Sequence, residues 1–393
     1  MKLKAYLFLF LLLGMTACQQ TDIPAPQTAV DCQVDHSTHP RAQLFQGLLQ
    51  SFTDTSMVGL TLLVDHPVEG LWVGSSGWAD IENEIPMTPC HLHFAASINK
   101  SYLGVMILQL AEEGKLSLDD RLDAYIDGDI LDRIPNGREF TIRQLLQNRS
   151  GMPDTFEAEF LLDFLNQPTR QYSMEELMTF LYGVSPVSAP GESYYYGDGN
   201  FILLAMVIES LDGDLAQAFQ TRIFDRIGAS QSFLIHEPGE LPDGMAASYW
   251  DRHENGVVEN VSEYQVALAA GLEGADGLIA SVQDLNLFLR GLSDGTLLTQ
   301  DSYQEMIDVV DIPEGEDNQN YAAYGLGIAK VQLTNEVWYG SFGNHVGSAA
   351  MALYNPAHDV SIVAVQNTGT FFSDQAKATF FGYLVANIEA MGL

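Results

Sequence analysis

The residues with the clearest chemical potential are a serine and a lysine three positions apart, Ser97 and Lys100, within residues 94–114. The apolar residues that follow them recur at helical spacing and predict a helix that faces a core. On such a helix the two side chains share one face, near the N-terminal end, where negative charge is favoured. A hydroxyl beside a lysine that burial neutralises is a nucleophile–base pair. Without further motifs, a capped surface helix explains the same residues better.

Two later stretches contain residues that would complete such a site. Residues 190–198 read PGESYYYGD and include Tyr196 and Asp198, just before a run typical of a buried helix. Residues 345–347 read HVG and lie beside a predicted strand. Together with the serine and lysine, these stretches offer a phenol, a carboxylate, an imidazole and a glycine that permits close backbone approach.

In this order and spacing, the three stretches resemble the motifs of the serine β-lactamase and penicillin-binding protein superfamily, for which S-x-x-K, S-D-N and K-T-G are typical. The most similar branch contains class C β-lactamases, D-alanyl-D-alanine carboxypeptidases and related esterases, whose second motif is Y-x-N and whose third is often H-x-G. Residues 141–153, TIRQLLQNRSGMP, resemble the family stretch T-I-R-x-L-L-x-H-x-S-G, with Asn148 where histidine is usual. The resemblance covers roughly residues 41–393.

The resemblance implies a role for each polar residue of the motifs. Ser97 attacks an acyl carbon and forms an acyl-enzyme. Lys100 accepts the serine proton if burial lowers its pKa, and Tyr196 is the second candidate base if neighbouring cations favour its phenolate. We expect Tyr196 to activate the deacylating water or an incoming acceptor. His345 would donate a hydrogen bond to Tyr196 and, when protonated, bind a substrate carboxylate.

The substrate-binding groups follow from the same resemblance, with one departure. Asp198 replaces the usual asparagine, and an ionised aspartate only accepts hydrogen bonds. It would pair with Lys100 and repel an anionic substrate. Gly347 would let the substrate approach the strand edge. The oxyanion hole would consist of the N–H of Ser97 and, by family analogy, that of Ser348.

The pattern of predicted elements agrees with this fold. Strands are predicted at both ends of the chain, with a mainly helical region at about residues 115–270 between them. We therefore expect one domain over residues 41–393, an α/β (α+β) fold that is β-lactamase/transpeptidase-like, with an antiparallel sheet, N- and C-terminal helices and a helical inserted subdomain. The predicted flanking helices are 42–52 and 374–390, and the predicted strands are 57–64, 70–79, 324–331, 337–342, 348–354 and 360–366.

The N-terminus has the composition of a targeting segment. Residues 1–17 combine a basic start, a short apolar run and small residues before Cys18, which resembles a bacterial lipoprotein signal. The apolar run is too short for a spanning helix. We expect export, acylation at Cys18 and a membrane anchor on the periplasmic side, with Gln19 indicating the outer membrane of a two-membrane bacterium; plain secretion is the alternative. Residues 18–40 would form a polar tether.

Two cysteines remain in the exported part, Cys32 and Cys90. An even pair outside the cytoplasm favours a disulfide, which would join the tether to the loop before Ser97. Free thiols are one alternative, and a metal site is the other. The histidines near the two cysteines that such a metal site would use are His36, His39, His91 and His93.

The composition limits the class of partner. The chain has 52 acidic and 17 basic residues and a net charge of −35, which argues against binding nucleic acid or an anionic membrane surface through the folded part. Its hydrophobic content of 47% supports a sizeable core. A surface this acidic suits a saline environment, where counter-ions screen self-repulsion.

The sequence therefore predicts a serine acyl hydrolase, without metal or cofactor, that acts through a Ser97 acyl-enzyme on a small-molecule or peptide substrate. An ester or a peptide, including a D-amino-acid peptide, is favoured by His345 and Asp198. A class C-like β-lactamase or D-Ala-D-Ala carboxypeptidase is the alternative within the fold. A non-catalytic penicillin-binding-like protein is the alternative from another class, because Asp198 and Asn148 depart from the family pattern. The G-x-S-x-G elbow of lipase-type hydrolases is absent.

Overall fold

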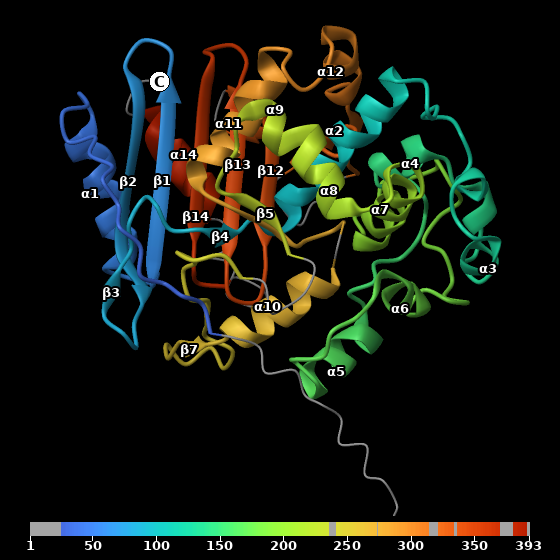
Figure 1. Cartoon of the computed structure of the whole chain (residues 1–393), viewed down its shortest axis with the longest axis horizontal. Helices are drawn as coiled ribbons and strands as arrows, with labels where there is room; N and C mark the ends of the chain where they lie inside the picture. Colours follow the sequence, from blue (N-terminus) through green and yellow to red (C-terminus); the bar gives the residue numbers. More distant parts are fainter. Residues whose placement is uncertain are drawn as a thin grey trace, which may run out of the picture.

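The computed structural model describes residues 25–235, 241–272, 274–313, 321–333, 336–369 and 380–390. Its largest element is a nine-stranded sheet with the order β3-β2-β1-β14-β13-β12-β11-β10-β9, in which neighbouring strands are antiparallel (Figure 1). Strands from the two ends of the chain meet where β1 pairs with β14. The strands are β1 (Gly59–His66), β2 (Gly70–Asp80), β3 (Ile85–Pro86), β9 (Val310–Asp311), β10 (Tyr321–Tyr324), β11 (Ala329–Leu333), β12 (Glu336–Asn344), β13 (Ala349–Asn355) and β14 (Val360–Gln366).

Helices cover both faces of the sheet. On one face lie the terminal helices α1 (Ala42–Thr53) and α14 (Phe380–Ala390), which touch through an edge-on contact of Phe52 with Tyr383. Helix α11 (Val282–Ser293) lies in front of β14 and β13 in Figure 1. Because both faces are covered, β14 is buried along its whole length, which explains the continuous apolar run from Ile362 to Val365 within it.

A mainly helical subdomain lies beside the sheet, on the right in Figure 1, as the sequence predicted. A small antiparallel sheet, β4-β8-β5, connects it to the large one. The further helices are α2 (Asn99–Glu112), α3 (Gly128–Leu131), α4 (Ile142–Leu146), α5 (Ala158–Asn166), α6 (Met174–Thr179), α7 (Asp198–Asp212), α8 (Leu215–Phe219), α9 (Asp225–Ile227), α10 (Ser262–Gly271) and α12 (Gln300–Met306), and the short strands are β4 (His93–Phe94), β5 (Ser232–Leu234), β6 (Tyr249–Trp250), β7 (Glu259–Asn260) and β8 (Leu278–Ala280).

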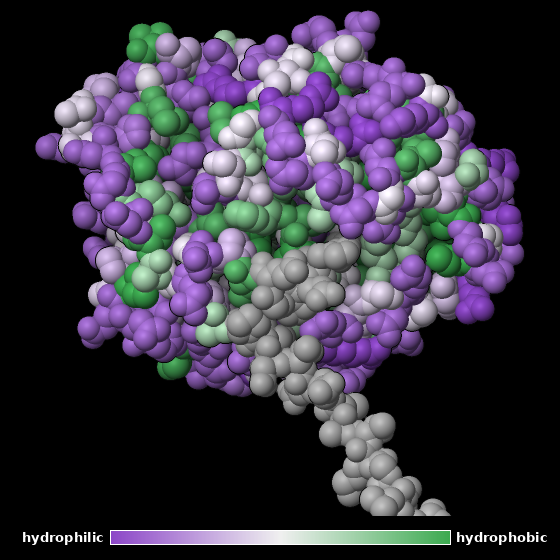
Figure 2. Space-filling view, viewed as in Figure 1, coloured by the Kyte–Doolittle hydropathy of each residue, from purple (hydrophilic) through white to green (hydrophobic). Residues whose placement is uncertain are grey.

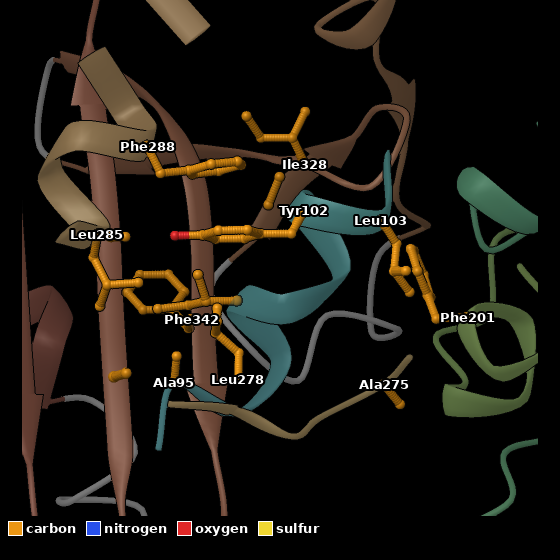
Figure 3. Packing of buried hydrophobic residues seen from close by; sticks show 14 of the residues in the cluster. Ala95, Tyr102, Leu103, Phe201, Ala275, Leu278, Leu285, Phe288, Ile328 and Phe342 are labelled. Carbon is orange, nitrogen blue, oxygen red and sulfur yellow. The ribbon is translucent and has the colours of Figure 1, made fainter. Parts of the chain in front are cut away.

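Helix α2 runs through the core between the sheet and the helical subdomain. Every residue from Asn99 to Leu110 is buried, so the helix is enclosed on all sides. Tyr102 stacks on Phe288 of α11 with ring centroids 3.7 Å apart, and Leu103 points toward Phe201 of α7 (Figure 3). Contacts in several directions hold the start of this helix, and therefore Ser97, in one place.

One predicted strand is wrong. Residues 324–331 contain the last residue of β10, a turn and the first part of β11, where the sequence predicted a single strand. Gly327 has a φ of 77°, and a methyl group on it would lie 2.8 Å from the carbonyl oxygen of Lys100. The turn therefore uses the positive φ and small size of glycine to bring the sheet against the buried helix α2.

The predicted tether is attached to the domain over its described part, residues 25–40. Cys32 and Cys90 form the disulfide that the sequence favoured over free thiols and metal ligation. His91 Nε2 lies 3.0 Å from the carbonyl oxygen of the buried Thr28. We call residues 25–40 the strap, because a covalent bond and buried contacts join it to the loop before Ser97.

Neither a metal site nor a membrane-spanning helix occurs among the described residues. Burial, with a smaller contribution from the neighbouring His91, lowers the pKa of His93 to about 3, so this imidazole is neutral. No group of His, Cys, Asp or Glu within the described ranges is arranged to hold a metal. Among the helices of those ranges, none has the length and hydropathy to cross a bilayer. The predicted signal at 1–17 and Cys18 lie outside the described residues.

The surface is strongly hydrophilic, as the charge balance predicts. On the face seen in Figure 2, hydrophilic residues predominate and apolar residues occur in small groups between them. Among the described acidic residues only Asp80, Asp251, Asp276 and Asp284 are buried, so the others can be screened by counter-ions.

Candidate active site

Ser97 lies in a 3₁₀ turn, Ala96–Ile98, immediately before α2 rather than inside its first turn. It is partly exposed, whereas all other residues from His91 to Leu110 are buried. Ala96 has a left-handed φ of 49°, a conformation that costs an alanine about 1–2 kcal/mol. The turn therefore brings the serine hydroxyl out of an otherwise buried segment at an energetic cost.

Lys100 is 1% exposed and points at Ser97. Its Nζ donates to Ser97 Oγ over 2.8 Å and to the carbonyl oxygen of Ala275 over 3.2 Å. The same Nζ lies 2.6 Å from Asp198 Oδ1, so the pairing expected from the sequence is present. Before Lys100 can take the serine proton it must give up one of its own, and Asp198 is the adjacent acceptor.

Tyr196 stands beside this pair. Lys100 Nζ lies 5.1 Å from the centre of its ring. Burial raises the pKa of Tyr196 well above that of a free phenol, Asp198 raises it further, and the Ser97 hydroxyl has a smaller opposing effect. The expectation that cations would favour a phenolate is therefore not met, because carboxylates dominate its surroundings. Tyr196 is a neutral phenol that can relay a proton.

A second carboxylate, Asp154, adjoins Asp198. Asp154 Oδ1 accepts a hydrogen bond of 2.9 Å from the backbone N–H of Asp198. Burial raises the pKa of Asp154 to about 7, and the charge of Asp198 contributes to the same shift. Sequence reasoning missed this residue, because a loop aspartate after the proline of residues 141–153 carries no signal of its own.

Asn148, where the family usually has histidine, supports the loop that carries Tyr196. Its side chain is fully buried, and its Oδ1 accepts from Gly197 N–H at 3.3 Å and from Asn200 Nδ2 at 3.1 Å. Ser150 Oγ donates to Asn200 Oδ1 at 2.6 Å. These bonds connect the loop after α4 to the start of α7. The asparagine that replaces the usual histidine therefore has a structural role.

The glycine opposite the nucleophile is Gly343, which corrects the prediction of Gly347. A methyl group on Gly343 would lie 3.0 Å from the backbone nitrogen of Ser97 and closer still to the carbonyl oxygen of Ala95. A methyl group on Gly347 would instead meet Ser248. Only a glycine at position 343 lets β12 approach the nucleophile this closely.

His345 and Ser348 lie in the turn that follows β12. The N–H of His345 donates to the carbonyl oxygen of Ser348 over 2.9 Å, which closes that turn. His345 Nε2 lies 2.9 Å from Asp276 Oδ2, and this partner takes the place that the sequence gave to Tyr196. Ser348 lies beyond the turn, at the start of β13, so its position as an oxyanion donor on the strand next to Ser97 is also wrong.

The edge of β12 supplies the second oxyanion donor. Strand β11 pairs with β12 as far as Gly340, and beyond it Tyr321 Oη bonds both the N–H of Phe342, at 3.1 Å, and its carbonyl oxygen, at 3.3 Å. Because backbone groups alternate along a strand, the N–H of Asn344 faces the same edge. The donors beside the nucleophile are therefore the N–H groups of Ser97 and Asn344.

Ser341 occupies the position two residues before Gly343, where the third motif has lysine or histidine. It is 3% exposed, and its Oγ lies 2.8 Å from Ser101 Oγ. This part of the sheet edge therefore lacks the cation with which the motif's lysine or histidine could hold a substrate carboxylate.

These features define the serine β-lactamase/transpeptidase class of fold: a serine–lysine pair between an antiparallel sheet and a helical subdomain, with a tyrosine and a glycine-bearing strand beside it. The family model described as Beta-lactamase matches residues 42–386. The chain belongs to this family, which confirms the resemblance seen in its motifs.

Named relatives agree with the family. The chain is 26% identical over 285 residues to Penicillin-binding protein 4* of Bacillus subtilis, covering 69% of this chain and 60% of that protein. It is 26% identical to a D-aminopeptidase of Gluconobacter oxydans, covering 65% and 46%. The chain thus spans about half the length of these relatives.

Solved structures share the fold. The D-stereospecific amidohydrolase from Streptomyces sp. matches with a TM-score of 0.74 and 24% identity, over 88% of this chain and 98% of that one. The D-amino acid amidase from Ochrobactrum anthropi SV3, complexed with L-phenylalanine amide, matches with a TM-score of 0.77 and 22% identity, over 89% and 98%. The predicted fold class is therefore confirmed.

Proposed function

We propose that the protein is a serine acyl hydrolase that cleaves the amide or ester bond of small substrates with a free ammonium group beside the acyl carbon, such as D-aminoacyl amides and short D-aminoacyl peptides. The observation that carries the proposal is the buried Ser97–Lys100–Asp198 chain, with Lys100 Nζ 2.8 Å from the serine and 2.6 Å from the carboxylate. It combines a nucleophile, a base and an anion in one contact network.

The charges around the site support a substrate that carries an ammonium group. The helical side of the site, which we call the helical wall, holds Asp198 and Asp154, and Lys100 is a cation close to them. The sheet wall has Ser341 where a lysine or histidine would bind a carboxylate. A β-lactam or a C-terminal D-Ala-D-Ala peptide is anionic, so it would meet repulsion on one side and no partner on the other.

The relatives are consistent with this substrate class. One is named a D-aminopeptidase, and two matching folds are a D-stereospecific amidohydrolase and a D-amino acid amidase. These names describe enzymes that act on D-amino acid derivatives. They motivate the choice of D-configured test substrates.

The residues suggest a balanced sequence of proton transfers. Lys100 passes a proton to Asp198 and, now neutral, takes the proton of Ser97 as Oγ attacks the acyl carbon. The N–H groups of Ser97 and Asn344 stabilise the oxyanion. Collapse breaks the bond to the leaving group, which receives a proton through Tyr196. Water then attacks the acyl-enzyme, and its proton passes through Tyr196 and Lys100 to Ser97 Oγ as the serine is released. Asp198 finally returns its proton to Lys100, which restores the starting state.

The test compares matched substrates on the purified protein: D-alanine amide, L-alanine amide, N-acetyl-D-alanine amide, a p-nitrophenyl ester and nitrocefin. We expect D-alanine amide to be turned over best and Ser97→Ala to abolish turnover and covalent labelling by a fluorophosphonate probe. Nitrocefin or the N-acetylated amide as the best substrate would contradict the ammonium preference. A wild type that neither labels nor turns over a substrate would favour the non-catalytic alternative.

The signal-like N-terminus supports a location for this activity: an exported protein anchored through an acylated Cys18 on the periplasmic side, at the outer membrane, or else secreted. The Cys32–Cys90 disulfide is consistent with export. Metabolic labelling with an alkyne fatty acid tests the anchor: the label should be lost in Cys18→Ser and kept in Cys32→Ser. A cytoplasmic, unlabelled protein would contradict it.

A further inference from the structure

A buried histidine–aspartate contact near the nucleophile has no part in the proton path described above. His345 Nε2 lies 2.9 Å from Asp276 Oδ2, and the two side chains are 4% and 5% exposed. His345 Nδ1 accepts a 2.9 Å hydrogen bond from the N–H of Val346, so the ring proton is on Nε2 and faces the carboxylate. Breaking such a pair leaves a buried charge uncompensated, so both partners are needed together.

The histidine belongs to the strand that completes the oxyanion hole. It directly follows Asn344, the last residue of β12, whose N–H faces the edge of the strand beside Ser97. At the end of β12, Asn344 pairs with Ala349, and the N–H of His345 bonds the carbonyl oxygen of Ser348, after which the chain has turned into β13. A contact that holds the His345 side chain therefore acts on the turn directly beside the Asn344 N–H.

The aspartate belongs to the loop that holds the nucleophile's helix. Residues 274–277 read GADG, and the glycines at both ends of this loop have positive φ values of 94° and 95°. The carbonyl oxygen of Ala275 accepts from Lys100 Nζ at 3.2 Å, and that of Asp276 accepts from Asn99 Nδ2 at 2.6 Å. The loop is thus bonded directly to the first turn of α2. Asp276 Oδ1 is also fixed, by the N–H of Gly277 at 2.7 Å.

We infer that His345 and Asp276 are positioning residues, whose pair sets the separation between the Asn344 N–H on the sheet and the Ser97 N–H on the helix side. The inference rests on the proposed function, because it concerns the two donors that would bind the oxyanion. An oxyanion exists only in the tetrahedral state, so the pair contributes to the rate of the chemical step and not to substrate binding. Neither residue touches the substrate.

The test measures kcat, KM and the inhibition constant of a D-alanine boronic acid analogue, which forms a tetrahedral adduct on a serine. The variants are Asp276→Asn, His345→Gln and His345→Ala. The control is Asp65→Asn, which removes the partner of Arg290 in an ion pair between β1 and α11. We expect kcat to fall about 10–100-fold in Asp276→Asn and His345→Ala. KM should change less than threefold, and boronate affinity should fall with kcat.

Two further comparisons separate positioning from general support of the fold. His345→Gln retains an N–H donor near Nε2, so it should keep more of kcat than His345→Ala. Asp276→Asn combined with His345→Ala should be no worse than the more damaging single change, because the two act as one unit.

The inference is overturned if the folded variants keep wild-type kcat and boronate affinity. It is also overturned if kcat falls only in proportion to the folded fraction, as it would in Asp65→Asn. A wild type that turns over none of the substrates would overturn the proposed function and this inference with it. An active wild type with unaffected variants overturns the inference alone.

Discussion

The helical wall and the sheet wall of the site differ in charge and in the contacts that stabilise them. The helical wall carries Asp198 and Asp154 close to the lysine, and burial of Asp154 raises its pKa to about 7. The sheet wall presents the uncharged Ser341 and Gly343 and a backbone N–H. The first can recognise the charge of a substrate, and the second can only fit its backbone and stabilise an oxyanion. Substrate choice and transition-state binding are therefore assigned to different elements.

The largest expected effect comes from removing the cation of the helical wall. Lys100→Met should lower kcat about 10²–10⁴-fold, because the serine loses its proton acceptor and Asp198 loses its partner. Turnover of D-alanine amide measures the loss, with Lys330→Met on β11 as the control. Activity retained in Lys100→Met would assign the base to another residue and remove the central feature of this wall.

The next largest effect is expected when the carboxylate of Asp198 is removed. Asp198→Asn restores the residue that the family usually has and should lower kcat/KM for D-alanine amide by about 10–150-fold, since hydrogen bonds to charged groups contribute about 1.5–3 kcal/mol. The N-acetylated amide, which has no ammonium group, should lose less, because only the acceptance of the Lys100 proton is affected for this substrate. An equal loss for both substrates would show that Asp198 acts on Lys100 and not on the substrate.

A smaller, pH-dependent effect is expected at Asp154. Its carboxyl loses a proton near pH 7, so kcat/KM for D-alanine amide should rise as the pH increases through about 7, and Asp154→Asn should flatten that rise. The sign for stability is opposite. The raised pKa favours the folded state while the group is protonated, and this contribution is lost as the pH rises through about 7. Asp154→Asn should therefore raise the thermal midpoint more at pH 8 than at pH 5; an equal shift would contradict the raised pKa.

The smallest effect is expected from a substitution of Ser341 on the sheet wall. Ser341→Lys gives this wall a cation and should raise kcat/KM for an N-acyl-D-Ala-D-Ala peptide a few-fold relative to D-alanine amide. Ser341→Ala is the matched control, because it removes the bond to Ser101 without adding charge. If both variants respond alike, the charge difference between the walls does not control substrate choice.

The predictable parts of the site were those whose chemistry is local in sequence. Ser97 and Lys100 need only the spacing of a helix, and Thr141 caps α4 with Gln144 as its composition indicates. The strands at both ends of the chain and the helical region between them were predicted from hydrophobic periodicity. These features depend on neighbours a few residues away, which a sequence displays directly.

The third motif could not be located in the same way. Gly343 and Gly347 lie four residues apart, and H-V-G matches the usual pattern better than S-F-G. The choice depends on which glycine meets Ala95 and Ser97, a contact across about 250 residues that the register of the sheet determines. Asp154 and Asp276 were missed for the same reason, because their partners are distant in the chain.

The strap limits how far the domain could move if Cys18 were acylated. At most seven peptide units separate Cys18 from Ala25, and beyond Ala25 the chain is joined to the domain by the disulfide and the Thr28 contact. Seven peptide units extend at most about 25 Å. An anchored enzyme would therefore work close to the bilayer. It would then sample substrates at the membrane surface and leave the interior of the compartment to enzymes that diffuse freely.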